Sequence, residues 1–280
     1  MSRRASRHVT FVAGVIISGA LVVTAALSLV WTPADPLAMA IGERLQGPSL
    51  SHPFGTDQYG RDILARVMAG AVTSIAVGVI AVGIGIGAGA LIGLASGWTG
   101  GWPDEILMRL VDAVQGFPAI LSALLFAAVF GPGITISMVA VGLAFVPTFA
   151  RLTRSSVLEL RRRDFVAGAR ALGASDSRVV ARHIGPNTLP PVIVQATTSF
   201  PVAILAEAGL AYLGLGTQPP HPSWGLMLKE AQNFLPLSPS FALFPGGAIA
   251  LTVLGLNLLG DGLRDLLDPK TAWTRHAATG

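Results

Sequence analysis

Cysteine is absent from this chain of 280 residues. Its absence excludes a disulfide framework, a thiol nucleophile and a thiolate metal site. Charged residues make up only 12% of the sequence, whereas soluble domains carry about 25%, and hydrophobic residues make up 52%. The chain is therefore expected to lie mostly in a lipid bilayer. Nucleic-acid binding is a poor interpretation of the net charge of +4, because the arginines do not form a separate soluble domain.

Catalytic motifs are missing as well. Neither Lys229 nor Lys270 ends a G-x-x-x-x-G-K-[ST] loop, so the chain lacks the phosphate-binding loop of many ATPases. There is no H-E-x-x-H zinc motif, and the five histidines are scattered. The stretch LLGDG at 258–262 is faintly similar to an intramembrane aspartyl protease motif, but Leu258 replaces its first glycine. We therefore predict neither enzymatic activity nor a metal site.

Six apolar runs approach or exceed the roughly 20 residues that a membrane-spanning helix needs. A signal peptide is the alternative for the first run, but its apolar stretch is longer than the roughly 7–15 residues of a signal sequence. We predict an all-α polytopic membrane protein with six transmembrane helices. The predicted spans are Val9–Trp31, Ala71–Trp98, Leu110–Phe130, Ile134–Ala150, Leu189–Leu215 and Phe241–Gly260.

Basic residues are distributed unevenly over the segments between these spans. With the N-terminus inside, only Arg44, Arg61, Arg66 and Lys229 of the 19 basic residues fall in outer segments. Because basic residues concentrate in cytoplasmic segments, both termini are predicted to be cytoplasmic, in the inner cell membrane. The polar segment 164–187 then lies in the cytoplasm as well.

Two carboxylates lie within the predicted spans, Asp112 and Glu207. A charge at mid-membrane costs on the order of 2.5–3.5 kcal/mol, so Glu207 must be paired, protonated or facing water. It is either a pore contact or, as we favour, a hydrogen-bonding group between packed helices. A stand-alone secondary transporter is a weaker alternative, because proton-driven carriers need a chain of such groups.

Small residues recur every four positions in the second predicted span, at Ala81, Gly85, Gly89 and Gly93. This spacing is typical of membrane helices whose backbones approach closely. We therefore expect this face to pack tightly against a neighbouring helix.

The segment DFVAGARALGASDSRVVARHIGPN at 164–187 is polar although apolar runs flank it. Asp164 is predicted to cap a short helix at its N-terminus. Phe165, Ala169 and Leu172 follow the i, i+4, i+7 spacing of one apolar stripe. Because a helix of about eight residues is marginal alone in water, something must cover this stripe. Lipid headgroups, the rest of the chain or another protein are the three alternatives.

Gly173 is expected to follow the helix with a positive φ angle. A second helix is predicted to start at Ser175 or Asp176, with Pro186 ending it. Arg170 is expected to be a solvated charge at the rim, worth about 0–1 kcal/mol.

This segment resembles the EAA loop of ATP-binding-cassette (ABC) importer permeases, which reads Glu-Ala-Ala, three residues, Gly, nine residues, Ile-x-Leu-Pro. Ala169, Gly173 and Pro186 match that pattern. Ala167 stands where the glutamate would be, and Gly168 replaces the middle alanine. The isoleucine and leucine are also replaced.

Three further stretches resemble the second permease subunit of dipeptide, oligopeptide and nickel importers. They are HPFGTDQYGRDILARVMAGAVTS at 52–74, EAGLAYLGLGTQPPHPSWGLML at 207–228 and LLGDGLRDLLDPK at 258–270. The resemblance spans residues 52–270. It implies a binding-protein-dependent (MetI-like) permease core that forms half of a peptide pathway, with nickel or another small solute as the alternative cargo.

The resemblance also implies partners: a sister permease subunit, two cytoplasmic ATPase subunits that bind ATP and magnesium, and an extracytoplasmic binding protein. This chain itself is expected to bind no cofactor. Its short helix would be a coupling helix seated in an ATPase groove. The coupling residues would be Asp164, Phe165, Ala167, Gly168, Ala169, Arg170, Leu172, Gly173 and Pro186.

We divide the chain into an N-terminal part (1–70), a permease core (71–265) and a C-terminal tail (266–280). In the outer segments, Asp57, Arg61 and Asp62 either contact the binding protein or form a solvated elbow, and Asp62 and Arg66 have the i, i+4 spacing of an ion pair. Trp224 either contacts the binding protein or anchors at the headgroups.

Overall fold

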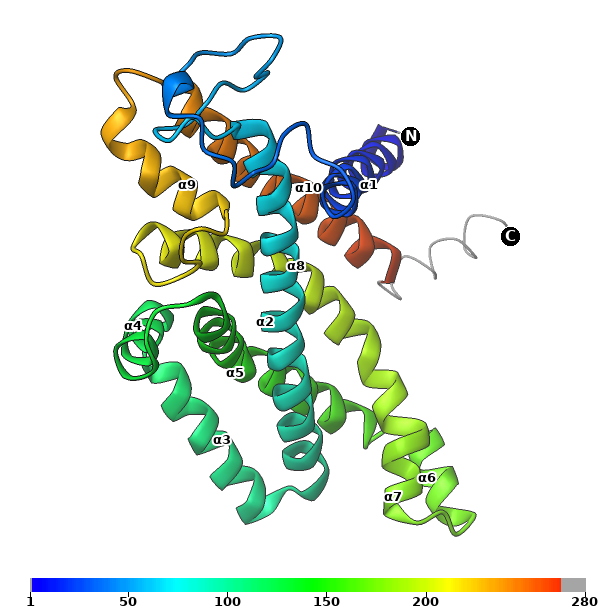
Figure 1. Cartoon of the computed structure of the whole chain (residues 1–280). Coiled ribbons are helices and arrows are strands. Elements are labelled where there is room, and N and C mark those ends of the chain that lie inside the picture. Colours follow the sequence, from blue (N-terminus) through cyan, green and yellow to red (C-terminus); the bar gives the residue numbers. More distant parts are fainter. Residues whose placement is uncertain (1, 268–280) are drawn as a thin grey trace.

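The computed structural model describes residues 2–267, and the side chains of residues 10–265 within them (Figure 1). The predicted all-α architecture is confirmed, and one isolated antiparallel bridge joins Thr56 and Asp62. The long helices are α1 (Ser2–Ser28), α2 (Ile63–Thr99), α3 (Gly101–Gly116), α4 (Ala119–Phe130), α5 (Ile134–Leu160), α8 (Gly185–Tyr212) and α10 (Ser240–Leu267). The short ones are η1 (Ile41–Glu43), α6 (Asp164–Ala171), α7 (Asp176–Val179), η2 (Val180–Ile184), α9 (Trp224–Ala231) and η3 (Gln232–Phe234).

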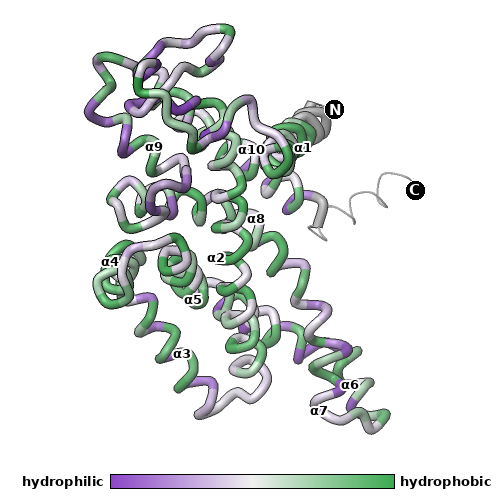
Figure 2. Tube along the Cα trace, in the orientation of Figure 1, coloured by the Kyte–Doolittle hydropathy of each residue, from purple (hydrophilic) through white to green (hydrophobic). Residues whose placement is uncertain are grey.

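Five stretches are long and apolar enough to cross a membrane, so the chain is a multi-pass membrane protein. In Figure 1, α2 runs through the middle of the molecule, α1 and α10 lie together on one side, and α6 and α7 form a lobe at one end. Figure 2 shows hydrophilic residues gathered near α9 and around α6 and α7, with hydrophobic helices between. The five stretches are Thr10–Ser28, Ile63–Thr99, Ile134–Leu160, Asp176–Tyr212 and Ser240–Asp265.

The third predicted span, Leu110–Phe130, is not one helix. It divides into α3 and α4, which are bent by 84° relative to each other. Pro118 separates the two helices and cannot donate a backbone hydrogen bond. Phe117 before it is extended, with φ −91° and ψ 126°, as a residue that precedes proline prefers. Counted as one broken span, the pair is the sixth.

The prediction that Pro186 ends the second short helix is wrong. The π-helical turn η2 continues α7 into α8 without a break, and the Gly185 N–H donates to the Val180 carbonyl. Pro186 therefore lies in the first turn of α8, where a missing N–H is tolerated.

The small residues of α2 pack against α5, which confirms the expected close approach. A Cβ atom on Gly89 would lie 2.6 Å from the Val146 carbonyl oxygen, and one on Gly93 would lie 2.3 Å from the Ala150 carbonyl oxygen. Backbone atoms of α5 thus occupy the space that side chains would need. We call this contact the α2–α5 seam.

The seam predicts opposite effects for two glycines of the same helix. Gly93→Ala should destabilise the subunit by about 1–3 kcal/mol, because the methyl group forces the two helices apart. Gly87→Ala is the matched control, since nothing lies within 4 Å of a Cβ there and alanine favours the helix. Thermal unfolding in detergent measures both variants. Equal unfolding temperatures would contradict the seam.

Candidate functional site

The first residue of α6 differs from the prediction. Arg163, with φ −81° and ψ 146°, occupies the N-cap position, and Asp164 is the first helical residue without a capping hydrogen bond from its side chain. The chain turns only at Arg163, because Arg161 and Arg162 still follow the end of α5. The Asp164 carboxylate remains in the first turn, where the helix dipole favours a negative charge.

The predicted turn after α6 is confirmed. Gly173 has φ +80°, a conformation that glycine adopts at little cost. Its N–H donates to the Arg170 carbonyl at 2.9 Å, and the Ala174 N–H donates to the Ala169 carbonyl at 3.1 Å. These two bonds form a Schellman motif, which ends α6 and directs the chain into α7.

Val166 lies on the face of α6 that packs inward and is 1% exposed. It forms a small core together with Val157, Val179 and Ile184. Of the predicted stripe, Ala169 packs against this core, whereas Leu172 is 91% exposed and Phe165 is 43% exposed. All three residues border a hollow of about 430 Å³. The rest of the described chain therefore leaves Phe165 and Leu172 largely uncovered. The hollow is lined by Phe165, Gly168, Ala169, Leu172, Ala174, Arg178 and His183.

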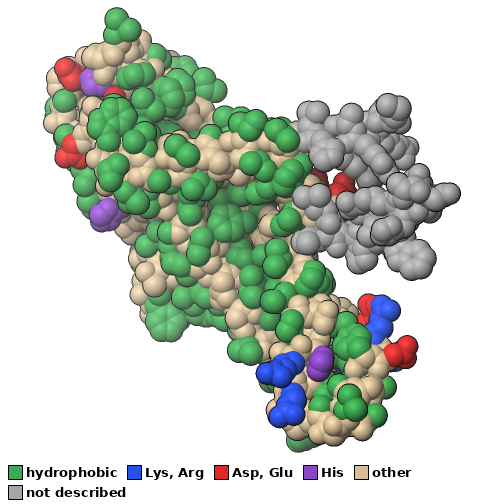
Figure 3. Space-filling model, turned by 90° about the vertical axis from the view of Figure 1, so that its right-hand side faces the viewer, with side chains coloured by type: hydrophobic (Ala, Val, Ile, Leu, Met, Phe, Trp, Pro, Cys, Tyr) green, Lys and Arg blue, Asp and Glu red, His purple; other side chains and the backbone are tan. Residues whose placement is uncertain are grey.

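Figure 3 shows this lobe as a separate protrusion with arginine side chains beside apolar ones, below a broad hydrophobic face. Ala167 and Gly168 are exposed on α6, whereas Pro186 lies at the start of α8 and does not line the hollow.

Arg170 is exposed, as expected of a charge at the rim, and it also makes contacts that the sequence does not predict. Its side chain is 48% exposed, and its Nη2 donates to Asp176 Oδ1 at 3.2 Å. Its guanidinium carbon also lies 4.8 Å from the centre of the Trp98 ring. The side chain is thus placed between α7 and the end of α2, a contact that no local sequence pattern indicates.

An ion cluster of Asp57, Arg61, Arg66 and Glu230 joins the segment before α2 to α9. Asp57 Oδ2 accepts from Arg61 Nε at 2.6 Å and lies 3.5 Å from Arg66 Nε. Glu230 Oε2 accepts from both arginines, at 3.1 Å and 2.9 Å. Because Asp57, Arg61 and Arg66 are all buried, the predicted solvated elbow is wrong for these residues, whereas residues 32–54 are exposed or half-buried.

The predicted Asp62–Arg66 ion pair is also wrong, since Arg66 belongs to the ion cluster. Asp62 instead caps α2 by accepting from the Ala65 N–H at 2.7 Å, and it bonds His52 Nδ1 at 2.9 Å. Trp224 is 2% exposed and donates from Nε1 to the Val67 carbonyl, so it is no headgroup anchor.

The residues predicted to contact a binding protein, Asp57, Arg61, Asp62 and Trp224, are thus buried and do not lie on a surface that a partner reaches in this conformation. They fasten the segment before α2 and the α8–α9 connection to the N-terminal end of α2.

The two carboxylates of the predicted spans have different surroundings. Glu207 in α8 is fully buried and accepts from Thr217 Oγ1 at 3.2 Å, so it tethers the loop that follows its own helix. Asp112 in α3 is exposed and accepts from Arg151 Nη2 of α5 at 2.5 Å.

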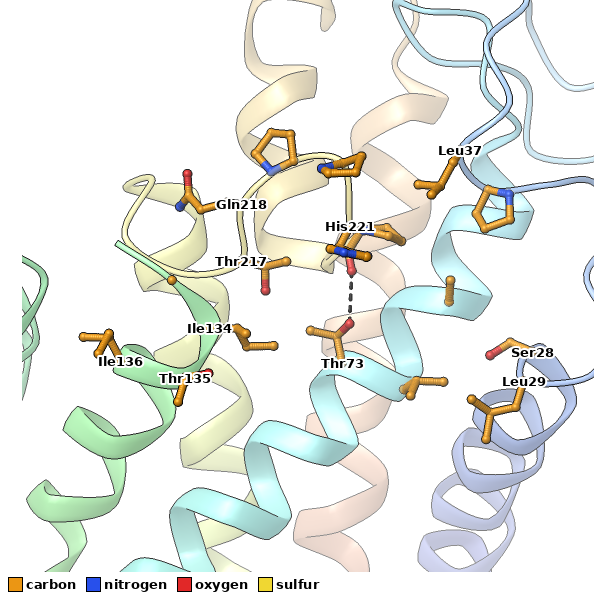
Figure 4. A pocket seen from close by; sticks show the side chains of 17 residues that line it. Ser28, Leu29, Leu37, Thr73, Ile134, Thr135, Ile136, Thr217, Gln218 and His221 are labelled. Carbon is orange, nitrogen blue, oxygen red and sulfur yellow. Dashed lines mark hydrogen bonds between the residues drawn. The ribbon is translucent and has the colours of Figure 1, made fainter. Parts of the chain in front are cut away.

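A cavity of about 750 Å³ lies between the end of α1, the N-terminal part of α2, the start of α5 and the loop 217–222 (Figure 4). Thr73 Oγ1 donates to the Pro222 carbonyl and holds the loop against α2. No Asp, Glu, Lys or Arg lines the cavity, and its polar lining residues are Ser28, Thr73, Thr135, Thr217, Gln218 and His221. We did not predict this cavity. The sequence signal for its loop is the proline-rich stretch TQPPHPSWG at 217–225, because proline restricts the backbone of a turn.

The fold, the α6 lobe and the cavity describe the membrane subunit of a transporter. The family described as "Binding-protein-dependent transport system inner membrane component" matches residues 85–273, and the chain belongs to this family. Among solved structures, the permease fold of the MetNI methionine ABC transporter is similar, with a TM-score of 0.59 at 16% identity, over 72% of this chain and 96% of that one. The predicted MetI-like core is therefore confirmed.

Individual relatives are similar over most of their length. The chain is 43% identical to the dipeptide transport system permease protein DppC of Alkalihalophilus pseudofirmus, covering 92% of this chain and 85% of that protein. It is 43% identical to a putative peptide transport system permease protein of Brucella abortus, over 96% and 90%. It is 47% identical to the glutathione transport system permease protein GsiD of Escherichia coli, over 80% and 74%.

The ion cluster predicts a large cost for removing the negative charge that its two arginines share. Glu230→Gln should destabilise the subunit by about 3–5 kcal/mol, because Asp57 is then the one carboxylate of the cluster that faces the buried Arg61 and Arg66 guanidinium groups. Glu159→Gln is the control, since its ion pair with Arg163 is exposed and worth at most about 1 kcal/mol. The unfolding temperatures of both variants measure this difference in stability. A Glu230→Gln subunit as stable as its control would show that the cluster does not hold the fold.

Proposed function

We propose that this chain is a transmembrane subunit of an ATP-driven importer and forms half of a pathway for peptides. The observation that carries the proposal is the uncovered apolar surface of α6 in a chain of this transport family. Leu172 alone is 91% exposed, and exposure of such an apolar surface to water is unfavourable. A protein partner that covers it gains the apolar area that the chain itself leaves open.

The partner we propose for the α6 surface is an ATPase subunit. Two such subunits would bind ATP and magnesium and supply the energy, while this chain binds no cofactor and catalyses no reaction. A sister permease subunit would complete the pathway, and an extracytoplasmic binding protein would deliver the cargo. This arrangement is supported by the family, whose description names both a binding protein and a membrane component.

The basic residues support an orientation in the inner cell membrane. The arginines of segment 164–187 lie on the lobe of α6 and α7, which also carries the exposed apolar side chains of α6. We place this lobe and both termini in the cytoplasm, following the preference of basic residues for that side. The cavity beside the loop 217–222, which we call the loop cavity, then opens toward the outside, where cargo arrives. Residues 1–70, 71–265 and 266–280 remain our division into N-terminal part, permease core and tail.

Peptides are the cargo that the relatives favour, because their names specify dipeptides, peptides and glutathione. The cavity fits such a role in one respect. Its lining carries no carboxylate, ammonium or guanidinium group, so it does not select cargo by charge. Peptides of different side chains could therefore pass, with selection left to the binding protein. Nickel or another small solute stays the alternative.

The turn at Gly173 provides the experiment. Gly173→Val should weaken retention of the ATPase and abolish uptake, because a β-branched residue is strained at φ +80° by roughly 1–2 kcal/mol or more. Membrane levels and pairing with the sister subunit should stay normal, since the spans are unchanged. The measurements are ATPase that copurifies with the tagged subunit and uptake of a labelled dipeptide.

Gly173→Asn is the matched control, because asparagine adopts a left-handed conformation far more readily than valine. It should retain both the ATPase and uptake. Full ATPase retention and uptake in Gly173→Val would remove the coupling role from this loop. Uptake that continues with no ATPase present would identify a stand-alone carrier instead.

A further inference from the structure

Trp98 lies at the last turn of α2, beside the end of α5 and the lobe of α6 and α7. Its side chain packs against the small core of Val157, Val166, Val179 and Ile184, which belongs to α5, α6, α7 and η2. Its ring is also the point on which two guanidinium groups converge. The carbon of Arg161 lies 5.4 Å from the ring centre, and that of Arg170 lies 4.8 Å from it.

The Arg161 contact fastens the end of α5 to the end of α2. Arg161 Nη1 donates to the Gly97 carbonyl at 2.7 Å, next to the tryptophan. The α2–α5 seam extends to this end of α2, because a Cβ atom on Gly97 would lie 2.8 Å from Val157 Cβ. Arg161 and the seam therefore make the two helix ends move together.

The contact between Arg170 and Trp98 connects α6 to the joined ends of α2 and α5. Arg170 is the one predicted coupling residue whose charged side chain reaches back from α6 to a transmembrane helix. It leaves the hollow free, since it is not among the residues that line it. A partner can therefore occupy the hollow without displacing Arg170 from Trp98.

We infer that Trp98 is a positioning residue for energy coupling, which passes movements of α6 to α2 through its contact with Arg170. The inference rests on the proposed role of α6. An arginine over an aromatic face is attracted by the ring quadrupole, so the contact resists both withdrawal and tilting of α6. The small apolar core keeps α6 folded onto the chain without it. Loss of the contact should therefore loosen the transmission and leave the docking surface intact.

The test uses the complete transporter with its binding protein in proteoliposomes, and tritiated alanyl-alanine as the probe. Trp98→Leu should retain the bound ATPase, whereas the ATP hydrolysed per peptide imported should rise about two- to five-fold, the range that one such contact supports. Arg170→Gln should also raise this ratio, because it removes the Arg170 contact and keeps that of Arg161. The double variant should be no worse than Trp98→Leu, because the Arg170 contact is already lost in Trp98→Leu.

Conservative variants separate this contact from simple packing. Trp98→Tyr keeps an aromatic face and Arg170→Lys keeps the cation, so both should restore most of the wild-type ratio. Asp176→Asn is the matched control, because it removes the exposed ion pair of Arg170 and keeps the ring contact. It should leave the ratio unchanged.

Three results would overturn the inference: an unchanged ratio in Trp98→Leu and Arg170→Gln, loss of the bound ATPase in Trp98→Leu, or a Trp98→Tyr ratio as high as that of Trp98→Leu. If Trp98→Leu does not assemble, Arg170→Gln decides, since Arg170 is half exposed. Failure of the coupling proposal itself would be visible separately, as ATPase retention and uptake in Gly173→Val.

Discussion

The close approach of α2 and α5 is the constraint on which the rest of the structure depends. Gly89 and Gly93 let backbone atoms of α5 occupy the place of side chains, so the helices pack at a separation that few other residues allow. In a bilayer, lipid is as apolar as leucine, and tight packing replaces the hydrophobic effect as a source of association. The seam therefore supplies the rigid support from which α6 protrudes.

Helix α2 connects the features that matter for function. Its 37 residues extend about 55 Å, well beyond the roughly 30 Å of a hydrocarbon core. The ion cluster and the cap of Asp62 hold its first turns, the loop cavity borders its N-terminal part, and Trp98 lies at its other end. A displacement of α2 would therefore change the cavity and the α6 lobe together.

Local patterns predicted the features that local physics determines. Hydropathy located the spans, the four-residue spacing of small residues located the seam, and Gly173 marked a turn with positive φ. Contacts between segments that are distant in the sequence could not be predicted from such local patterns. Glu230 is 169 residues from Arg61, and Trp98 is far in sequence from Arg170, so no spacing rule relates them. The bend at Pro118 had a sequence signal, which hydropathy alone concealed.

The central claim is that an ATPase subunit covers the α6 hollow, and site-specific cross-linking tests it most directly. Because the chain has no cysteine, Leu172→Cys introduces its single thiol, at a side chain that is 91% exposed. A photoreactive label there should join this chain to the ATPase in the assembled transporter. A label at Leu251→Cys, on an α10 side chain that is 58% exposed, should not. Equal labelling of the ATPase from both positions, or none from Leu172, would contradict the account.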